Sequence, residues 1–479
     1  MQLRPYQRYA VEEVRFVGRG RAPTLLMVCP TGGGKTVIGS RVVAERTAQG
    51  QRVLWLAHRE ELIDQAAAAL AREGLAVGVL RGERKEALDA PVLVSSWQAL
   101  KNRMELARER QFLVVDEAHH ARDDNSYGQV IAAMSGVHVL GLTATPWRTD
   151  GKGLTDVFAE HFVVREPHQL RDEGFLAGLE GFRYRTFDAN DIRIRGGDFV
   201  PGQLEDAVTS DVELAGDIVA QWQAHAGGAR TIAYCVGVSH AVELAARFRE
   251  AGVAAEHIYE NSADRAGILS RLRSGETRVV TNFAILTEGF DCPPVSCVVM
   301  ARPTLSVTLH LQMLGRALRP WCYDCGREAP TNLPRCAFCG GGNHKRKGRV
   351  HDHAGNLARL GHPYAARDWS PADTKPPTVG AFYGFKEIPP QQPKEGARQA
   401  VEVDATRYEV RDVRSEDVER KKAKRRGGGT ASRCPDCGVT RLGVEGVELP
   451  PHTRWAMKRA GDGWQHVEVP CTVKGDYLD

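Results

Sequence analysis

A chain of 479 residues is long enough for two or three domains with hydrophobic cores of their own. Its net charge of +4 is too small to indicate a nucleic-acid-binding protein by itself. The hydrophobic runs are short and mixed with charges, which excludes a membrane span, and the N-terminus lacks the apolar core of a signal peptide. We therefore expect a cytoplasmic protein whose paired cysteines bind metal in a reducing compartment.

In the first third of the chain, strands are predicted to alternate with helices. The candidate strands are near-continuous apolar runs, which are typical of strands buried on both faces of a parallel sheet. These runs are TLLMVC (24–29), RVLWLA (52–57), PVLVSS (91–96), FLVVDE (112–117) and VHVLGLT (137–143). The stretch REELIDQAAAALAREG (59–74) predicts a helix that ends at Gly74.

A second alternation follows a less regular stretch. Its segments are RTIAYCV (230–236), SHAVELAARFREAG (239–252), RVVTNF (278–283), VSCVVMA (295–301) and a helix around 306–318. Two successive units of this size predict an α/β protein with two tandem doubly wound domains, each built on a parallel sheet.

The expected division of the chain has six parts. They are 1–165 for the first domain, 166–210 for a connecting segment, 211–320 with a continuation at 349–370 for the second domain, 321–348 for a cysteine-rich insertion, 371–398 for a linker and 399–479 for a C-terminal region. Prolines and glycines indicate the linker. In the C-terminal region the run RKKAKRR (420–426) favours a solvated basic segment that touches phosphates nonspecifically.

The sequence PTGGGKT (30–36) predicts a phosphate-binding loop between a buried strand and a helix, where backbone N–H groups surround phosphate oxygens. Lys35 can reach the β- and γ-phosphates of ATP, and the Thr36 hydroxyl can hold Mg²⁺. The strict pattern has glycine where this chain has Cys29. The predicted nucleotide-binding residues of this loop are Thr31, Gly32, Gly33, Gly34, Lys35 and Thr36.

The sequence DEAHH (116–120) ends a predicted strand downstream of that loop. At the carboxyl edge of a parallel sheet, Asp116 can hold Mg²⁺ beside the phosphates. Glu117 can orient and deprotonate a water that attacks the γ-phosphate. An acidic pair at a strand end is weak evidence alone, but its position after PTGGGKT makes it strong.

Together, PTGGGKT and DEAH resemble the motifs of superfamily 2 helicases of the DEAH-like type, most closely the RadD-like and type III restriction-subunit-like branch. The matching motifs span about residues 3 to 320. The resemblance implies two RecA-like domains with ATP and Mg²⁺ between them. It also makes LRPYQ (3–7) similar to the adenine-reading Q motif, with Gln7 as the adenine contact and Arg4 in support.

Further motifs of the branch follow in order. LAHREEL (56–62), SSWQAL (95–100) and TNFAILTEGFDCP (281–293) resemble motifs Ia, Ib and V. The resemblance implies nucleic-acid contacts at His58, Arg59, Ser96 and Thr281, and nucleotide contacts at Gly289 and Asp291. Trp97, Trp147 and Arg148 are candidates for base contacts, with core packing as the alternative.

QMLGRALRP (312–320) resembles motif VI, which supplies arginine fingers from the second domain. Positive charge on the γ-phosphate stabilises the transition state of phosphoryl transfer. Arg316 and Arg319 are three residues apart and would share one face of a helix. GLTATP (141–146) resembles motif III, and the residues implied to couple hydrolysis to strand binding are His119, Thr143, Thr145 and Gln312.

Four cysteines follow motif VI with the spacing of a zinc ribbon. They are Cys322, Cys325, Cys336 and Cys339. Four thiolates in tetrahedral geometry suit structural Zn²⁺, and the polar sequence between the pairs could not form a core without metal. An iron–sulfur cluster also uses four cysteines, but paired Cys-x2-Cys spacing favours zinc.

The zinc segment is predicted to be an insertion, because RVHDHAGN (349–356) resembles a strand that follows motif VI in RadD-like proteins. The basic run HKRKGR (344–349) adjoins it. We hypothesise that this basic-edged insertion grips phosphates or separates strands. A second pair, Cys434 and Cys437, could form another site with Cys471, His452 or His466, or remain an unpaired knuckle.

The leading interpretation is an ATP-dependent DNA helicase or translocase that acts in repair or recombination. Three alternatives stay open: the motor subunit of a restriction system, an RNA helicase, and a non-catalytic zinc-dependent nucleic-acid-binding protein. Nucleic acid is the expected partner, DNA before RNA by analogy with RadD-like proteins. Single-stranded-DNA-binding or nuclease proteins are possible further partners, and no membrane is expected.

Overall fold

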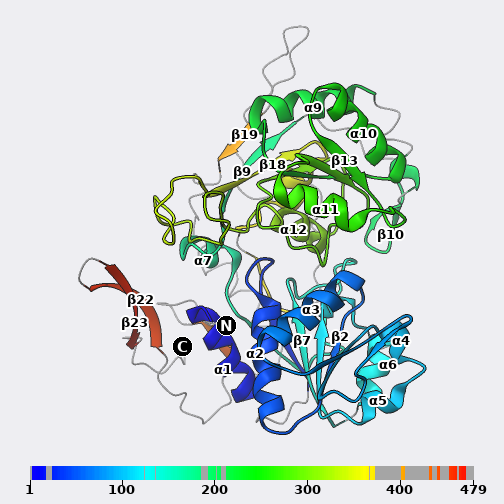
Figure 1. Cartoon of the computed structure of the whole chain (residues 1–479), viewed down its shortest axis with the longest axis vertical. Helices are drawn as coiled ribbons and strands as arrows, with labels where there is room; N and C mark the ends of the chain where they lie inside the picture. The colour runs from blue at the N-terminus through cyan, green and yellow to red at the C-terminus, as the bar shows by residue number, and fades with distance from the viewer. Residues whose placement is uncertain are drawn as a thin grey trace, which may run out of the picture. The chain divides into compact units, whose positions relative to one another are not determined.

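The computed structural model of the chain describes both predicted α/β domains and several strands beyond them (Figure 1). The described ranges are 3–17, 24–122, 125–134, 136–184, 192–200, 202–205, 212–365, 367–372, 401–404, 431–433, 440–442, 453–460 and 463–470. The chain divides into two compact units, Met1–Arg407 and Tyr408–Asp479. Within the described ranges, no helix has the length and apolar character needed to cross a bilayer.

An eight-stranded sheet forms the centre of the first domain. Its strand order is β4-β3-β5-β2-β6-β7-β1-β8, and all neighbours are parallel except β3 and β4. The strands are β1 (Thr24–Val28), β2 (Val53–Leu56), β3 (Val77–Arg81), β4 (Arg84–Glu86), β5 (Val92–Ser95), β6 (Phe112–Asp116), β7 (His138–Thr143) and β8 (Glu160–Val163). The five apolar runs predicted as strands are confirmed. The polar β4 and β8 and the apolar β3, VGVLR, were not among the predicted strands.

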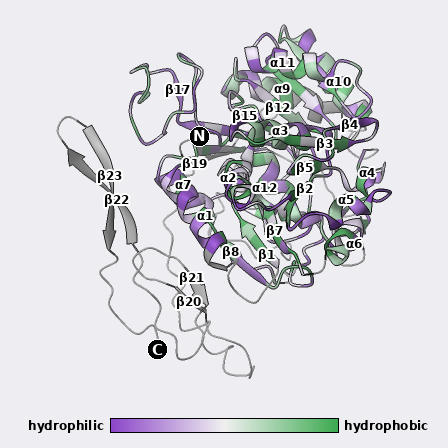
Figure 2. Ribbon diagram, turned by 60° about the horizontal axis from the view of Figure 1, so that its bottom comes forward, coloured by the Kyte–Doolittle hydropathy of each residue, from purple (hydrophilic) through white to green (hydrophobic). Residues whose placement is uncertain are grey.

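Helices cover both faces of this sheet, as strands that are buried on both faces require. Val53 and Trp55 of β2 pack on one face, while Leu54 and Leu56 pack on the other. The first face carries α1 (Pro5–Val17), α2 (Lys35–Ala48) and α3 (Glu60–Arg72), and the second carries α4 (Trp97–Leu100), α5 (Met104–Arg108) and α6 (Ser126–Ala133). Hydrophobic residues gather in strands such as β2 and β5, and α1 carries hydrophilic residues outside (Figure 2).

A seven-stranded sheet forms the centre of the second domain, in the order β13-β14-β12-β15-β18-β9-β19, with only β19 antiparallel. The strands are β9 (Gly178–Arg183), β12 (Thr231–Tyr234), β13 (Ala255–Ile258), β14 (Val279–Asn282), β15 (Cys297–Met300), β18 (Lys347–Asp352) and β19 (Val401–Asp404). Helices α9 (Val212–Ala226) and α10 (Val238–Glu250) cover one face, and α11 (Arg265–Ser274), α12 (Val307–Gly315) and α13 (Asn356–Leu360) cover the other. Two parallel sheets in tandem confirm the predicted fold class (Figure 1).

The expected connecting segment, 166–210, contributes one strand, β9, to the second domain's sheet. It begins with α7 (Pro167–Asp172), and β9 then pairs in parallel with β18. A short hairpin follows, formed by β10 (Ile194–Arg195) and β11 (Asp198–Phe199). Because β9 is glycine-containing and only partly apolar, its sequence carries no strong strand signal.

The cysteine-rich insertion lies between α12 and β18. Its ends pair as a two-stranded antiparallel sheet, β16 (Trp321–Cys322) with β17 (His344–Lys345). Strand β18 then enters the second sheet between β15 and β9. The chain therefore leaves the second domain after motif VI and returns to it two residues after β17.

The second compact unit contains two small antiparallel sheets. They pair β20 (Ala431–Arg433) with β21 (Thr440–Leu442), and β22 (Thr453–Ala460) with β23 (Gly463–Pro470). Of the predicted second metal site, His466 falls within β23, while His452, Cys434, Cys437 and Cys471 lie outside the described residues. The same holds for the basic run 420–426 and for most of the predicted linker.

Candidate nucleotide and nucleic-acid site

The phosphate loop is tightly built around its glycines. Gly32 and Gly34 have φ of 87° and 88°, a left-handed conformation that side chains disfavour. A Cβ at Gly33 would lie 2.6 Å from Cys29 Sγ. The buried thiol of Cys29 thus fills the place next to Gly33, which explains how the loop tolerates a departure from the strict pattern.

The Q-like motif, residues 3–7, hydrogen-bonds to the backbone of this loop. The Tyr6 hydroxyl donates to the Gly33 carbonyl oxygen at 2.8 Å, and burial raises the pKa of Tyr6 to about 12, so the donor stays protonated. Gln7 Nε2 also donates to Gly33 O, at 3.3 Å, and its Oε1 accepts the Arg4 backbone N–H. In this structure Gln7 therefore positions the phosphate loop, and Tyr6 is a loop-positioning residue that the sequence did not single out.

The two acidic residues at the end of β6 lie beside Lys35. The Lys35 ammonium is 2.9 Å from Glu117 Oε1. Burial, and then repulsion by Glu117, raises the pKa of Asp116 to about 7. A divalent cation would offset this repulsion, and the Asp116 carboxylate with the Thr36 hydroxyl offers the oxygen ligands that Mg²⁺ prefers.

Glu117 is held in a strained backbone conformation with φ of 47°, of the kind that clusters at functional sites. Burial alone would raise its pKa, but Lys35 and His119 bring the pKa below its ordinary value. The carboxylate therefore stays ionised and directed toward the phosphate loop, which suits a group that orients a water.

The two candidate arginine fingers do not share a helical face, contrary to the expectation from their spacing. Helix α12 ends at Gly315, so both arginines come after it. Arg316 donates to the carbonyl oxygens of Thr287 and Phe290 and thereby holds the loop of motif V. The Arg316 guanidinium thus contacts the backbone of the motif V loop.

Arg319 lies directly on the phosphate loop of the first domain. A Cβ at Gly32 would be 2.9 Å from Arg319 Cδ. A Cβ at Gly315 would be 2.5 Å from Cγ2 of Thr31 in the same loop. Arg319 Nη1 is 3.0 Å from Asp291 Oδ1. The predicted residue Asp291 is thus brought to the nucleotide cleft through its ion pair with Arg319.

Glu328, in the insertion between the cysteine pairs, forms ion pairs with a residue of each domain. Its carboxylate pairs with Arg319 and, at 2.9 Å, with Arg4 of the Q-like motif. Burial alone would raise the pKa of Glu328, but Arg319 and then Arg4 lower it. Sequence reasoning missed this residue because its partners lie 9 and 324 positions away.

The four predicted coupling residues form one chain of contacts. His119 Nδ1 is 3.3 Å from Thr143 Oγ1, whose hydroxyl donates to the Thr145 carbonyl oxygen. Gln312 of the second domain lies 3.3 Å from His119 Nε2. Thr145 Oγ1 is 3.1 Å from Thr308 Oγ1, also of the second domain. This arrangement connects the strand end at Glu117 with α12.

Glu288, in the motif V loop, is a second residue that sequence reasoning missed. Its buried carboxylate contacts three histidines of the first domain, His58 at 2.9 Å, His119 at 3.2 Å and His120 at 3.1 Å, and accepts from Gln312. Burial alone would raise the pKa of Glu288, but these hydrogen bonds hold it well below the ordinary value. The only sequence signal was its place between predicted motif V residues.

The residues expected to contact nucleic acid differ in accessibility. Arg59 donates to the Ile285 carbonyl oxygen at 3.0 Å, and with His58 it contacts the motif V loop. Ser96 caps α4 by accepting the Ala99 N–H. Thr281 is fully buried and its hydroxyl donates to Ala241 O, so the expected contact at Thr281 has no exposed surface here.

Three further expectations have structural explanations. Gly289, at φ of 70°, packs its backbone against α3, where its carbonyl oxygen accepts from Gln65. Trp147 is buried, stacks on Trp369 and donates to a backbone carbonyl. Arg148 is buried and binds backbone oxygens and Asp156. Core packing therefore describes Trp147 and Arg148 better than base contact.

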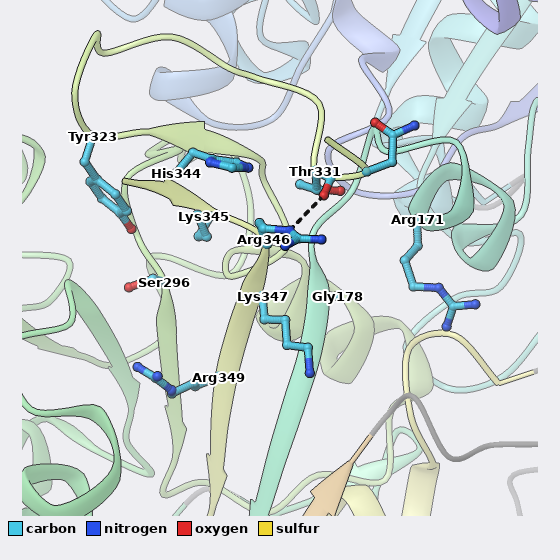
Figure 3. A pocket seen from close by; sticks show the side chains of 11 residues that line it. Arg171, Gly178, Ser296, Tyr323, Thr331, His344, Lys345, Arg346, Lys347 and Arg349 are labelled. Carbon is cyan, nitrogen blue, oxygen red and sulfur yellow. Dashed lines mark hydrogen bonds between the residues drawn. The ribbon is translucent and has the colours of Figure 1, made fainter. Parts of the chain in front are cut away.

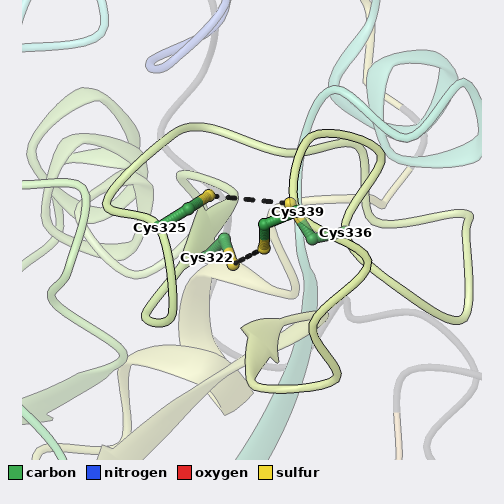
Figure 4. A group of neighbouring side chains, drawn as sticks. All are labelled: Cys322, Cys325, Cys336 and Cys339. Atoms are coloured by element: carbon green, nitrogen blue, oxygen red, sulfur yellow. Dashed lines mark hydrogen bonds between the residues drawn. The ribbon is translucent and has the colours of Figure 1, made fainter.

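The cysteines of the insertion converge as a tetrahedral metal site requires (Figure 4). The Sγ atoms of Cys322 and Cys339 are 3.7 Å apart, and those of Cys325 and Cys336 are 3.8 Å apart. All four lie within 4.8 Å of one another. A regular tetrahedron of Zn–S bonds has sulfur–sulfur edges of about 3.8 Å, so the arrangement fits Zn²⁺.

The fold and this cleft define a class of two-domain nucleotide-binding proteins in which each RecA-like domain supplies part of the site. Residues 1–148 match the family described as type III restriction enzyme, res subunit, and residues 213–320 match the helicase conserved C-terminal domain. Both domains are therefore similar to those of superfamily 2 helicases, the first to the res-subunit branch and the second to the helicase C-terminal domain.

Individual relatives agree with this placement. A "51.5 kDa protein" of a Lactococcus phage is 30% identical over 60% of this chain and 61% of its own length. The "Putative ATP-dependent helicase IRC3" of Saccharomyces cerevisiae is 28% identical over 66% of this chain and 49% of its own length. A solved fragment of a "putative HsdR subunit of a type I restriction enzyme" from Vibrio vulnificus has a TM-score of 0.56 at 18% identity, covering 77% of this chain and 66% of that one. The chain thus spans about half to three fifths of these curated relatives.

Proposed function

We propose that this chain is an ATP-driven motor that moves on nucleic acid as a helicase or translocase. One observation carries the proposal: Arg319 of the second domain lies against Gly32 of the first domain's phosphate loop, on the loop that also leads to Lys35. A nucleotide there would touch both domains, so its hydrolysis would change how they contact each other.

The residues of the cleft take distinct roles in this proposal. Lys35 binds the β- and γ-phosphates, while Thr36 and Asp116 hold Mg²⁺, which would neutralise phosphate charge when bound. Glu117 orients the attacking water and accepts its proton. Arg319 supplies positive charge to the transition state.

Force transfer would run through the contacts between the domains. Glu288 and Gln312 of the second domain contact His119 of the first. Movement of α12 would therefore displace the strand end that carries Glu117. Arg316 keeps the motif V loop in shape by binding its carbonyl oxygens. His58 and Arg59 lie at the same junction, which supports a role for motif Ia in relaying contact with nucleic acid.

DNA is the proposed track, and repair or recombination the proposed setting, by the resemblance to RadD-like helicases. A second candidate is the motor subunit of a restriction system, which the res-subunit match over residues 1–148 favours; it would need a nuclease partner. Zn²⁺ is the proposed structural metal of the four cysteines, where thiolate bonds would hold the insertion together.

ATP hydrolysis by the purified chain tests the proposal. Turnover would be measured without polymer and with single-stranded DNA, duplex DNA, forked DNA and RNA, beside Glu117→Gln. Stimulation by one polymer, absent from the variant, would identify the motor and its track, and strand-displacement assays would separate helicase from translocase.

Equal turnover in the parent and in Glu117→Gln would contradict the assignment of Glu117. No turnover with any polymer would exclude an autonomous motor. Reconstitution of activity by an added nuclease or restriction partner would then favour the restriction-type alternative.

A further inference from the structure

A basic groove lies where the cysteine insertion meets the second sheet. Its volume is about 690 Å³. Six basic side chains line it, and none of the described lining residues is acidic: Arg171, His344, Lys345, Arg346, Lys347 and Arg349. Figure 3 shows Lys347 on the sheet floor and Arg171 across from it. A concave, one-sign surface of this kind concentrates the field of its charges.

The basic side chains divide into structural and available ones. Lys345 is buried and donates to the carbonyl oxygens of Pro293 and Val295, and Arg346 donates to Thr331 O (Figure 3). These two fasten the wall of the groove. The charge of Lys345 is committed to backbone, whereas the exposed Arg346 uses only its Nε–H in this contact.

Besides Arg346, three cations lie at the groove surface. Arg349 has a long contact of 3.5 Å with Glu180, and Arg171 pairs with its sequence neighbour Asp172. Lys347 is exposed and has no acidic partner within 4.0 Å among the described residues. Asp172 and Glu180 offset the charges of only two of these three cations, so the net charge of the group is positive.

The groove lies at the amino ends of the strands of the second sheet, and the expected nucleic-acid contact of this domain, Thr281, lies toward their carboxyl ends. Gly178 and Lys347 are the first residues of β9 and β18, and Ser296 precedes β15. Thr281 lies toward the carboxyl end of β14. Because all these strands are parallel, a ligand in the groove would be separate from motif V's strand end.

The lining favours a phosphodiester backbone over a free nucleotide. A nucleobase needs an aromatic face to stack on, and Tyr323 and His344 carry the two aromatic rings among the described lining residues. The Arg230 guanidinium lies 5.6 Å from the centre of the Tyr323 ring, and the Tyr323 hydroxyl donates to Pro294 O. Phosphate contacts, by contrast, need only placed cations.

We infer that this groove binds the phosphodiester backbone of DNA as a second nucleic-acid contact, formed jointly by Arg171 of α7 and by Lys347 and Arg349 of β18. The inference rests on the proposed function as a nucleic-acid motor. The insertion completes the groove, since Thr331 donates its N–H to Gly174 O and its hydroxyl to Leu176 O, fixing one wall beside α7.

Salt-dependent DNA binding by the full, zinc-loaded chain tests this inference. Dissociation constants for a forked DNA would be measured by fluorescence anisotropy between 0.05 and 0.2 M salt, roughly the range where phosphate contacts dominate. Each lost contact lowers the slope of log K against log salt by about 0.9 and weakens binding about eightfold at 0.1 M salt. We expect one such loss for Lys347→Ala and two for Lys347→Ala with Arg349→Ala.

The matched control is Lys85→Ala, which removes an exposed lysine from the edge strand β4 of the first domain. All variants should keep the parent's zinc content, thermal midpoint and polymer-free ATP turnover. If the parent binds DNA and the double variant has the same slope, the groove proposal is wrong and the proposed motor function is unaffected.

Two other outcomes also decide the matter. A raised KM for ATP with an unchanged DNA slope would assign the groove to nucleotide phosphates and overturn the DNA proposal. A parent chain that binds neither DNA nor RNA would overturn the proposed motor function, and the groove with it.

Discussion

The two halves of the nucleotide cleft are built in different ways. In the first domain, the phosphate loop is supported from within: Tyr6 holds Gly33, and Lys35 pairs with Glu117. In the second domain, Arg319 is held by carboxylates, one of them Glu328 from the cysteine insertion. The first half is thus formed by one domain's own packing, whereas the second depends on a peripheral element.

This difference indicates which half of the cleft can respond to movements elsewhere in the protein. A loop fixed by backbone geometry changes little when distant parts move, but a guanidinium held by ion pairs moves with its partners. We therefore expect substitutions in the first half to affect nucleotide binding, and those around Arg319 to affect the rate of hydrolysis.

The largest expected effect separates the two arginines. Arg319→Ala should lower kcat for polymer-stimulated hydrolysis by roughly 10³-fold, the lower end for loss of an arginine finger. Arg316→Ala should cost roughly 10²-fold, since it acts by misplacing the motif V loop. Steady-state kinetics would compare both with Arg327→Ala, a surface arginine of the insertion that lies over Phe338. Equal losses for the two arginines would erase the distinction.

The next prediction sharpens the role of the insertion. Glu328→Gln should slow hydrolysis roughly tenfold with zinc retained, because a neutral amide holds Arg319 less firmly. Cys336→Ser should cause a similar loss together with loss of zinc, from one ion per chain in the parent. Zinc content by mass spectrometry and kcat would be measured side by side, with Glu328→Asp as the conservative variant. Normal kcat in zinc-depleted protein would show that the insertion does not support Arg319.

Communication between the halves should depend on Glu288. Glu288→Gln keeps the shape of the side chain but removes its charge, which interacts with three histidines. Stimulation by polymer should therefore fall about tenfold, in line with the roughly 1.5 kcal/mol of a hydrogen bond to a charged group. Turnover without polymer should stay unchanged. The control is Gln65→Ala, which breaks a different contact between the domains. A matching loss of stimulation in the control would point to general loosening.

The sequence predicted much of the first half and less of the second. Apolar runs such as 112–117 and the spacing of PTGGGKT carry local signals that survive without knowledge of tertiary contacts. Glu328 and Glu288 carry none, because their meaning lies in partners that the fold brings from distant parts of the chain. The spacing of Arg316 and Arg319 was also misleading, because α12 ends at Gly315, before either arginine.

Burial was the other property that the sequence could not provide. Thr281 fits motif V, but its strand is covered on both faces and its hydroxyl is used internally. Conversely, β9 of the expected connecting segment has a weak strand pattern, and pairing with β18 and β19 decides its conformation.

A smaller effect is expected in the self-contained half. Tyr6→Phe removes one hydrogen bond to the Gly33 carbonyl while keeping the ring, which should cost about 1 kcal/mol. The KM for ATP should therefore rise about fivefold with kcat nearly constant. Tyr9→Phe, on the same helix, is the matched control. A fall in kcat without a change in KM would mean that the loop's support reaches the chemical step, against the contrast between the halves.

The smallest predicted effect is a pH dependence at the junction of the halves. Burial alone would lower the pKa of His120, but Glu288 raises it above the ordinary value. A raised folded-state pKa means that the stabilisation is complete below the unfolded value of 6.5 and is lost as pH rises through the folded-state pKa. Since His120 is 33% exposed, solvent screening limits the contribution to about 0.5 kcal/mol.

Thermal unfolding of the parent and of His120→Asn between pH 5.5 and 8 would measure this contribution. The parent should lose slightly more stability than the variant as pH rises through the folded-state pKa of His120. His119 is fully buried and its pKa is lowered, chiefly by burial, so any titration of His119 would contribute a slope of the opposite sign. A parent that gains stability on the variant with rising pH would mean that His120 is neutral when it contacts Glu288, and the junction would then depend on hydrogen bonding alone.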